Sequence, residues 1–156
     1  MYFRPTNIAA KKAALHFLSC HEHGQYELQQ KLLNKGFDVS DIDEAIRFCR
    51  EHHYLDDLRY SKEQVRHNVK KGHGERRIRQ ELQAKQVLDD IIEQALNEEP
   101  QDWFQLAKLS AENSFHHFAT QGSAEYAQQV RFLQYQGFSV EQIRYALNSE
   151  LLATSN

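Results

Sequence analysis

The chain has 156 residues, and its 19 lysines and arginines against 22 aspartates and glutamates give a formal net charge of -3. This length excludes a large multidomain enzyme, and a content of 40% hydrophobic residues excludes a disordered acidic chain. Six glycines and two prolines are too few for the frequent turns of a β-sandwich or barrel, so the composition predicts an all-α fold. Two cysteines cannot form a disulfide framework, and no apolar run approaches the roughly 20 residues that cross a bilayer. We therefore expect a cytoplasmic protein that does not enter the membrane.

The spacing of apolar residues predicts helices along almost the whole chain. In order, these are residues 8–23, 26–35, 40–53, 57–71, 75–85, 88–97, 101–118, 123–136 and 139–150. Ser40 and Ser139 stand where N-caps are expected, and Gln142 gives the second of them a capping box. Gly36 and Gly137 stand where helices end in the left-handed conformation.

Similar residues recur at offsets of 50 and 51 positions. Relative to Gly36, Gln86 and Gly137, a leucine stands four residues before, an isoleucine six after and an alanine nine after. These matching residues are Leu32, Leu82 and Leu133, then Ile42, Ile92 and Ile143, then Ala45, Ala95 and Ala146. The pattern predicts three tandem three-helix repeats, residues 1–56, 57–100 and 101–156, that form an elongated, curved rod.

The near-neutral total charge conceals charged segments. Residues 59–85 carry nine basic and three acidic side chains, a net +6, between segments of -5 (residues 37–57) and -6 (residues 86–102). Within the basic segment, two Lys- and Arg-rich helices meet at the turn Gly72-His73-Gly74, where backbone N–H groups and a helix N-terminus could meet a phosphate. A solvated helix face is the alternative explanation of any charge run. The length of this run and its few acidic residues favour an anionic partner.

One pair of fragments has the residue types of a zinc site. Cys20 with His23, and Cys49 with His52, are each spaced to share a helix face, so together they offer four ligands. Both fragments end predicted helices, however, where histidine complements the helix dipole and free cysteine is often simply buried. The sequence also lacks a phosphate-binding loop, a dinucleotide glycine pattern and a nucleophile elbow. We expect no metal, no cofactor and no enzymatic activity.

Two motifs in the middle of the chain resemble the RecX family, whose members regulate the RecA recombinase. They are Tyr-Leu-Asp-Asp-Leu-Arg-Tyr at residues 54–60 and Lys-Gly-His-Gly-Glu-Arg-Arg-Ile-Arg-Gln-Glu-Leu at residues 71–82. Residues 26–32 and 131–139 resemble the first and last repeats of the family, so the resemblance covers nearly the full chain. Two residues depart from the family pattern: Glu75 replaces a frequent proline, and Gln86 replaces the usual glycine after the second-repeat helix.

The resemblance implies a monomeric, non-enzymatic protein that binds the RecA filament on single-stranded DNA. It would limit filament extension or promote disassembly, and so lower ATP hydrolysis, strand exchange and coprotease activity. The basic side chains of the two motif helices and their turn are the expected contacts with the filament or DNA, namely Lys62, Arg66, Lys70, Lys71, Arg76, Arg77 and Arg79. Tyr54, Leu55 and Asp56 are expected to join the first two repeats through packing and capping. A stand-alone nucleic-acid-binding module that uses the same basic helices is the alternative.

Overall fold

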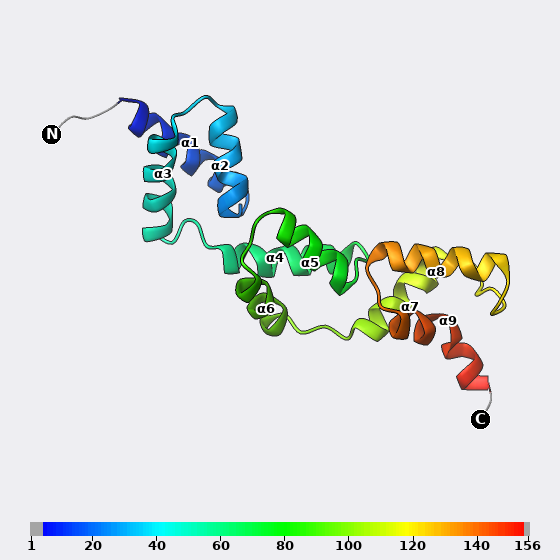
Figure 1. Cartoon of the computed structure of the whole chain (residues 1–156). Helices are drawn as coiled ribbons and strands as arrows, with labels where there is room; N and C mark the ends of the chain where they lie inside the picture. Colours follow the sequence, from blue (N-terminus) through cyan, green and yellow to red (C-terminus); the bar gives the residue numbers. More distant parts are fainter. Residues whose placement is uncertain (1–4, 155–156) are drawn as a thin grey trace. The chain divides into compact units, whose positions relative to one another are not determined.

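The computed structural model describes the backbone of residues 5–154 and the side chains of residues 7–148. This part of the chain contains nine α-helices and no strand, which confirms the predicted all-α fold (Figure 1). The helices are α1 (Pro5–Cys20), α2 (Gln25–Asn34), α3 (Val39–Glu51), α4 (Asp57–Lys70), α5 (Glu75–Ala84), α6 (Asp89–Glu98), α7 (Trp103–Ser114), α8 (Ala124–Gln136) and α9 (Val140–Thr154). None of these helices combines the length and apolar character needed to span a bilayer.

The same turn ends α2, α5 and α8, at the three points that the sequence spacing aligns. The left-handed residue of each turn has a positive φ: +90° at Gly36, +56° at Gln86 and +108° at Gly137. The amide that follows it donates to the carbonyl of a leucine in the helix, over 3.4 Å to Leu32, 3.1 Å to Leu82 and 3.1 Å to Leu133. These bonds satisfy carbonyls that the helix end leaves unpaired. Gln86 therefore adopts the turn for which the family usually has glycine.

Burial also follows the predicted repeat. The aligned isoleucines Ile42, Ile92 and Ile143 are each 2% exposed, and the aligned alanines Ala45, Ala95 and Ala146 are fully buried. Leucine and isoleucine supply most of the apolar area in such cores, while alanine lets neighbouring helices approach closely. The aligned positions are thus core positions in each of the three helix sets.

The predicted capping residues are partly confirmed. Ser139 Oγ accepts from the amide of Gln142 at 3.2 Å, and Gln142 Oε1 accepts from the amide of Ser139 at 2.9 Å, so the capping box is present. The prediction for Ser40 is wrong: α3 begins one residue earlier, and its N-cap, Asp38, makes no side-chain capping bond to the helix. Val39 is then the first residue of α3, and it is 65% exposed.

Two helices end three or more residues earlier than the apolar spacing predicts. The first ends at Cys20 rather than His23, and α7 ends at Ser114 rather than Phe118. After α7 the chain becomes extended at Phe115 (φ -123°, ψ 137°). The buried side chain of Gln129 replaces the lost helical bonds, because it accepts from the amide of Ala119 at 3.0 Å and donates to the carbonyl of His117 at 3.1 Å. A long-range partner thus ended a helix that local pattern alone would extend.

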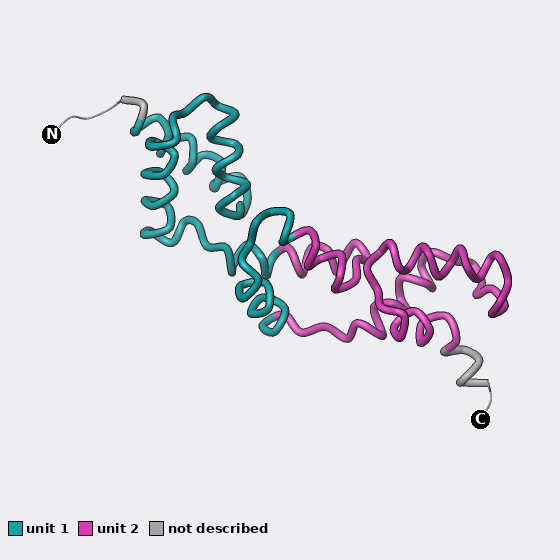
Figure 2. Tube along the Cα trace, viewed as in Figure 1, with its two compact units in different colours: residues 1–63, 82–98 teal, residues 64–81, 99–156 magenta. Residues whose placement is uncertain are grey.

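The chain divides into two compact units, coloured teal and magenta in Figure 2. Unit 1 comprises residues 1–63 and 82–98, and unit 2 comprises residues 64–81 and 99–156. Two of the three divisions fall inside helices α4 and α5, and the third falls directly after α6, in the segment that precedes α7. The division into repeats 1–56, 57–100 and 101–156 stays a prediction.

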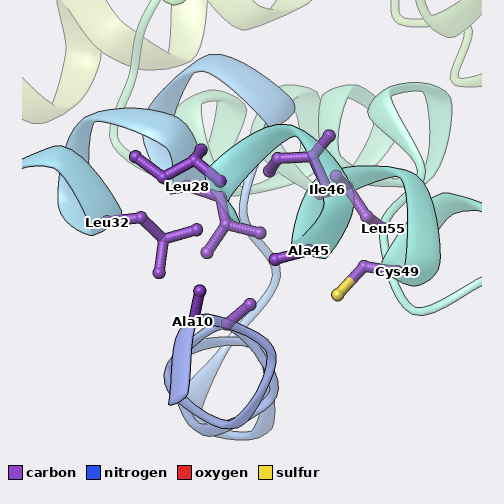
Figure 3. Packing of buried hydrophobic residues seen from close by; sticks show 9 residues of the cluster. Ala10, Leu28, Leu32, Ala45, Ile46, Cys49 and Leu55 are labelled. Atoms are coloured by element: carbon purple, nitrogen blue, oxygen red, sulfur yellow. The ribbon is translucent and has the colours of Figure 1, made fainter. Parts of the chain in front are cut away.

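The core of unit 1 forms where α1, α2 and α3 face one another. Leu28 and Leu32 of α2 project toward Ala10 of α1 and Ala45 of α3 (Figure 3). Cys49 and Leu55 extend this cluster along α3 and into the segment before α4. Burial raises the pKa of the Cys49 thiol, which keeps it protonated and apolar in character.

The core of unit 2 is built from α7, α8 and α9. Its buried members are Ala107, Ala111, Leu133, Phe138, Ile143, Ala146 and Leu147. Phe138 is 1% exposed and follows directly on Gly137, so the end of α8 is anchored by an aromatic side chain in the core. This anchoring fixes the position of the turn that meets α5.

Candidate functional site

Within unit 1, the turn before α2 contacts the start of α4 and the turn after α5; we call the contacts of residues 22–27 with residues 57–60 and Lys85 the first junction. The backbone amide of Gln25 donates to Asp57 Oδ1 at 2.8 Å. Arg59 Nε donates to Glu22 Oε1 at 2.6 Å, and its two terminal nitrogens donate to the carbonyls of His53 and Tyr54 at 3.0 and 3.2 Å. Arg59 is therefore a structural residue, although it belongs to the basic segment.

The remaining contacts of the first junction are steric and ionic. A Cβ built on Gly24 would lie 3.0 Å from the Tyr60 ring, so the ring packs directly against the glycine backbone. Lys85 Nζ lies 3.2 Å from Glu27 Oε2. The predicted capping role of Asp56 is confirmed, because its carboxylate accepts from the amides of Leu58 and Arg59. Leu55 is buried as predicted, whereas Tyr54 is 48% exposed.

Within unit 2, the N-terminus of α5 contacts the C-terminus of α8; we call the contacts of residues 74–77 with residues 134–137 the second junction. The amide of Gly74 donates to the carbonyl of Gln136 at 2.7 Å, and the amide of Arg76 donates to the carbonyl of Gly137 at 3.2 Å. The positive end of one helix dipole thus meets the negative end of another. Two of the amides that the sequence predicts for a phosphate site at the Gly-His-Gly turn thus already donate to protein carbonyls.

The second junction requires two glycines in direct backbone contact. A Cβ built on Gly74 would lie 2.5 Å from the carbonyl carbon of Gly137. A Cβ built on Gly137 would lie 2.6 Å from Arg77 Cβ and 2.7 Å from its amide nitrogen. Such separations are far inside van der Waals contact, so any side chain at either position must push the backbones apart.

His73 lies beside this junction, mostly buried, with a side chain that is 11% exposed. Its Nδ1 lies 2.8 Å from Asn68 Oδ1 and 3.7 Å from Glu81 Oε1. Burial lowers the pKa of His73, and the positive charge of Arg77 lowers it further, against the opposing effect of Glu81. The imidazole is thus a neutral hydrogen-bonding group of the turn.

The seven predicted contact residues differ in whether an acidic side chain accompanies them. Arg66 pairs with Glu99, Arg77 Nε lies 3.2 Å from Glu81, and Arg79 Nη2 lies 3.1 Å from Glu75. In the part of the chain that the structure describes, the remaining four have no acidic partner within ion-pair distance: Lys62, Lys70, Lys71 and Arg76. Of these four, all except Lys62 are exposed. These four therefore carry the uncompensated positive charge of the predicted set.

Two shallow clefts of unit 2 adjoin the last turn of α8. One, of about 280 Å³, is lined by Lys70, Lys71 and Gly72 together with side chains of α7 and α8. The other, of about 340 Å³, is lined by Arg76, Arg77, Gln80, Glu81, Gln134 and Tyr135. Both clefts are open and bordered by positive charge, which suits an extended anionic partner rather than an enclosed small molecule.

Sequence reasoning did not single out Tyr135, which lines the second of these clefts. Its side chain is 73% exposed, and the guanidinium carbon of Arg77 lies 5.0 Å from its ring centroid. One signal was available: Tyr135 stands two residues after the core residue Leu133, which places it away from the core face of α8.

The Cys20–His23 and Cys49–His52 fragments, whose residue types suit zinc, do not come together as one cluster of ligands. Among the described residues, neither Cys20 nor Cys49 belongs to a cluster of metal-ligating side chains. The cluster that does form is His21, His23 and Glu27. The two imidazoles are stacked, with centroids 4.0 Å apart and planes at 10°, so their in-plane lone pairs run parallel and do not converge on one ion. Lys31 Nζ, 2.6 Å from His23 Nε2, supplies the positive charge at this cluster.

Comparison with known proteins identifies the family of this chain. A curated relative from Vibrio parahaemolyticus, named regulatory protein RecX, is 59% identical over 143 residues, which cover 92% of each chain. The chain belongs to the RecX family. A relative of the same name from Vibrio cholerae is 48% identical over 139 residues, covering 89% of this chain and 91% of its own.

Family models also match two parts of the chain. The model of the first RecX three-helix domain matches residues 10–49, and that of the second matches residues 56–96. All seven predicted contact residues lie inside the second match. The junction residues Gly74, Arg76 and Arg77 belong to the same domain.

Solved structures share the fold. The structure of RecX from Lactobacillus salivarius superposes with a TM-score of 0.78 at 22% sequence identity, covering 94% of this chain and 97% of that one. A second RecX crystal structure gives a TM-score of 0.77 at 23% identity, covering 90% of this chain and 71% of that one. At such low identity the likeness establishes the RecX fold and no more.

Proposed function

We propose that this protein is a negative modulator of the RecA recombinase. It binds the filament that RecA forms on single-stranded DNA and limits filament extension or promotes disassembly, which lowers ATPase, strand-exchange and coprotease activities. Membership of a family of regulatory proteins, at 59% identity to a named RecX, is the observation that carries this proposal. The protein acts as a monomer in the cytoplasm, without catalytic chemistry of its own.

The binding surface in this proposal is the basic segment of α4, the following turn and α5. Lys62, Lys70, Lys71 and Arg76 supply charge that no acidic side chain compensates within the described chain. Arg66, Arg77 and Arg79 are held by Glu99, Glu81 and Glu75. Part of their charge is therefore neutralised before any partner binds, and they contribute mainly by position.

The decisive experiment is a titration of the DNA-dependent ATPase of RecA with the purified protein. Substoichiometric amounts should slow ATP hydrolysis. The double variant Lys70→Glu and Lys71→Glu should weaken this inhibition at least tenfold, because two exposed cations become anions. Lys12→Glu is the control, since Lys12 is an exposed lysine of α1 outside the basic segment. No inhibition at any ratio by the folded protein would refute the proposal.

The cleft beside Lys70 and Lys71 also suits the alternative, a nucleic-acid-binding module that acts without RecA. Four uncompensated charges on single-stranded phosphates give a slope of log affinity against log salt of about -3. Tight, salt-dependent binding to bare DNA at physiological ionic strength, with no response of the RecA ATPase, would favour this alternative. Both measurements use the same protein and the same oligonucleotide.

A further inference from the structure

The second junction holds an exposed aromatic ring against an arginine that is itself fixed in place. Tyr135 is the most exposed of the large hydrophobic and aromatic side chains that the structure describes, at 73%. Its partner in the pair, Arg77, is fixed by Glu81 Oε1 and by Gln136 Oε1, each at 3.2 Å. An arginine held in this way loses little side-chain freedom when a further group binds beside it.

The other exposed tyrosine of unit 2 shows the contrast. Tyr145 is 38% exposed and packs edge-on against Phe104, with centroids 5.6 Å apart and planes at 90°. Tyr135 packs on no aromatic ring among the described residues and carries a cation at one face. Since most of its surface remains exposed beside the guanidinium, the opposite face of the ring is open.

Polar groups around the ring match the chemistry of an unpaired nucleotide. The cleft beside Tyr135 is lined by the amide side chains of Gln80 and Gln134, which can donate to and accept from base edges. Arg76, at the same cleft, has no acidic partner in the described chain and donates to the carbonyl of Gln134 at 2.6 Å. Proteins bind single strands by combining such cations with aromatic rings on which bases stack.

The local charge balance separates residues that support the ring from residues that can neutralise a phosphate. Arg77 is compensated by Glu81, so its contribution is to polarise and support the ring rather than to neutralise a phosphate. Lys70 and Lys71, which are uncompensated, line the neighbouring cleft. Gln136, which accepts a hydrogen bond from Arg77, lines that cleft as well. Ring and lysines therefore adjoin the same last turn of α8.

We propose that Tyr135, supported by Arg77, is a stacking platform for an unpaired base of single-stranded DNA, while Lys70, Lys71 and Arg76 receive the flanking phosphates. This inference rests on the proposed binding to a single-stranded DNA filament and adds a direct contact with the bases. Stacking on an aromatic side chain tolerates any base, so the contact is independent of sequence.

The test measures affinity for a short labelled oligothymidylate and for an abasic oligonucleotide of the same length, by fluorescence anisotropy over a range of salt. Tyr135→Ala should weaken binding to oligothymidylate about tenfold and leave binding to the abasic strand unchanged. Tyr135→Phe should restore most of the affinity. The salt slope should be the same for all three proteins, because stacking releases no counterions.

Two controls separate stacking from general effects. Lys70→Gln should weaken binding to both strands and reduce the magnitude of the salt slope by about 0.7. Tyr145→Ala, in the same unit but paired with Phe104, should change neither affinity. Circular dichroism and thermal unfolding confirm that each variant keeps its fold.

Several outcomes would overturn the platform. One is that Tyr135→Ala loses the same affinity for both strands, and another is that it loses no affinity for oligothymidylate. A third is that the wild-type protein shows no detectable binding of oligothymidylate even at low salt. A Tyr135→Ala variant that binds DNA normally but no longer inhibits RecA would assign the side chain to a protein contact instead. Conversely, base-dependent binding by a wild-type protein that does not inhibit RecA would refute the proposed function and keep the platform.

Discussion

The two junctions of this protein are built from different chemistry. In the first junction, ion pairs join the turn before α2 to α4 and to the turn after α5, with Arg59 bound to Glu22 and Lys85 near Glu27. In the second, backbone meets backbone, because Gly74 and Gly137 approach too closely for any side chain. Ion pairs tolerate small displacements and weaken with salt, whereas a backbone contact at this distance allows no substitution. The difference predicts that the second junction is far less tolerant of mutation.

The largest effect is expected at Gly137. Gly137→Ala places a Cβ against Arg77 and also strains the φ of +108°, so we expect a loss of about 3 kcal/mol in the free energy of unfolding. Gly36→Ala is the matched control: Gly36 ends α2 with a φ of +90°, but nothing lies within 4 Å of its built Cβ. The control should cost only about 1 kcal/mol. Urea unfolding followed by circular dichroism measures both, and equal losses would contradict the contact between the two backbones.

An intermediate effect is expected at Arg59. Arg59→Met removes the cation from a partly buried carboxylate, since the Glu22 side chain is 26% exposed. Because the Arg59 side chain itself is 42% exposed, solvent screening limits the expected loss to about 1 kcal/mol. A double-mutant cycle with Glu22→Gln isolates the coupling, which should shrink in concentrated salt. A coupling that does not respond to salt would show that packing, rather than charge, holds the first junction.

A smaller effect is expected from pH at the first junction. Burial lowers the pKa of His23 below its ordinary 6.5, and Lys31 lowers it further, although hydrogen bonding to His21 and the charge of Glu27 oppose this. The unfolded chain then binds a proton that the folded chain rejects, so stability should fall as pH drops below about 6.5. Proton NMR should show the His23 ring titrating below 6.5. A His23 ring that titrates at or above 6.5 would contradict the expectation.

The smallest effect is expected at the outer ion pair of the first junction. Lys85 is 46% exposed, and its separation from Glu27 Oε2 is 3.2 Å. Exposed pairs of this kind contribute well under 1 kcal/mol, so Lys85→Met should change the unfolding free energy by only about 0.3 kcal/mol. A loss as large as that of Arg59→Met would mean that the junction acts as one coupled ionic network.

Features that depend on near neighbours in the chain could be predicted from the sequence. The capping box of Ser139 and Gln142 forms as expected, and the turns at Gly36 and Gly137 have the expected left-handed residue. The N-cap of α3 is Asp38, two residues before the predicted Ser40, because the choice of an N-cap among neighbouring polar residues depends on how the preceding turn packs. The predicted end of α7 was wrong because of a tertiary contact as well, since the buried Gln129 binds the backbone after Ser114.

The candidate site was predictable only as a set of charges. The basic segment is visible in the sequence, but the acidic partner of Arg66 is the distant Glu99, directly after α6. Whether an arginine is free or compensated therefore depends on tertiary contacts. Tyr135 was not predicted for the same reason: its significance lies in the approach of Arg77 from another helix.

The amino-acid sequence by itself determined the helical class, the positions of the repeat core and the sign of charge in the middle segment, because periodicity, turn residues and charge are local properties. Only the tertiary structure decided that the amides of Gly74 and Arg76 donate to carbonyls at the end of α8, which cations remain uncompensated and which aromatic ring is exposed beside an arginine. Each of these depends on contacts between segments far apart in the chain. A sequence pattern records what each segment contributes, and packing decides which of those groups remain available to a partner.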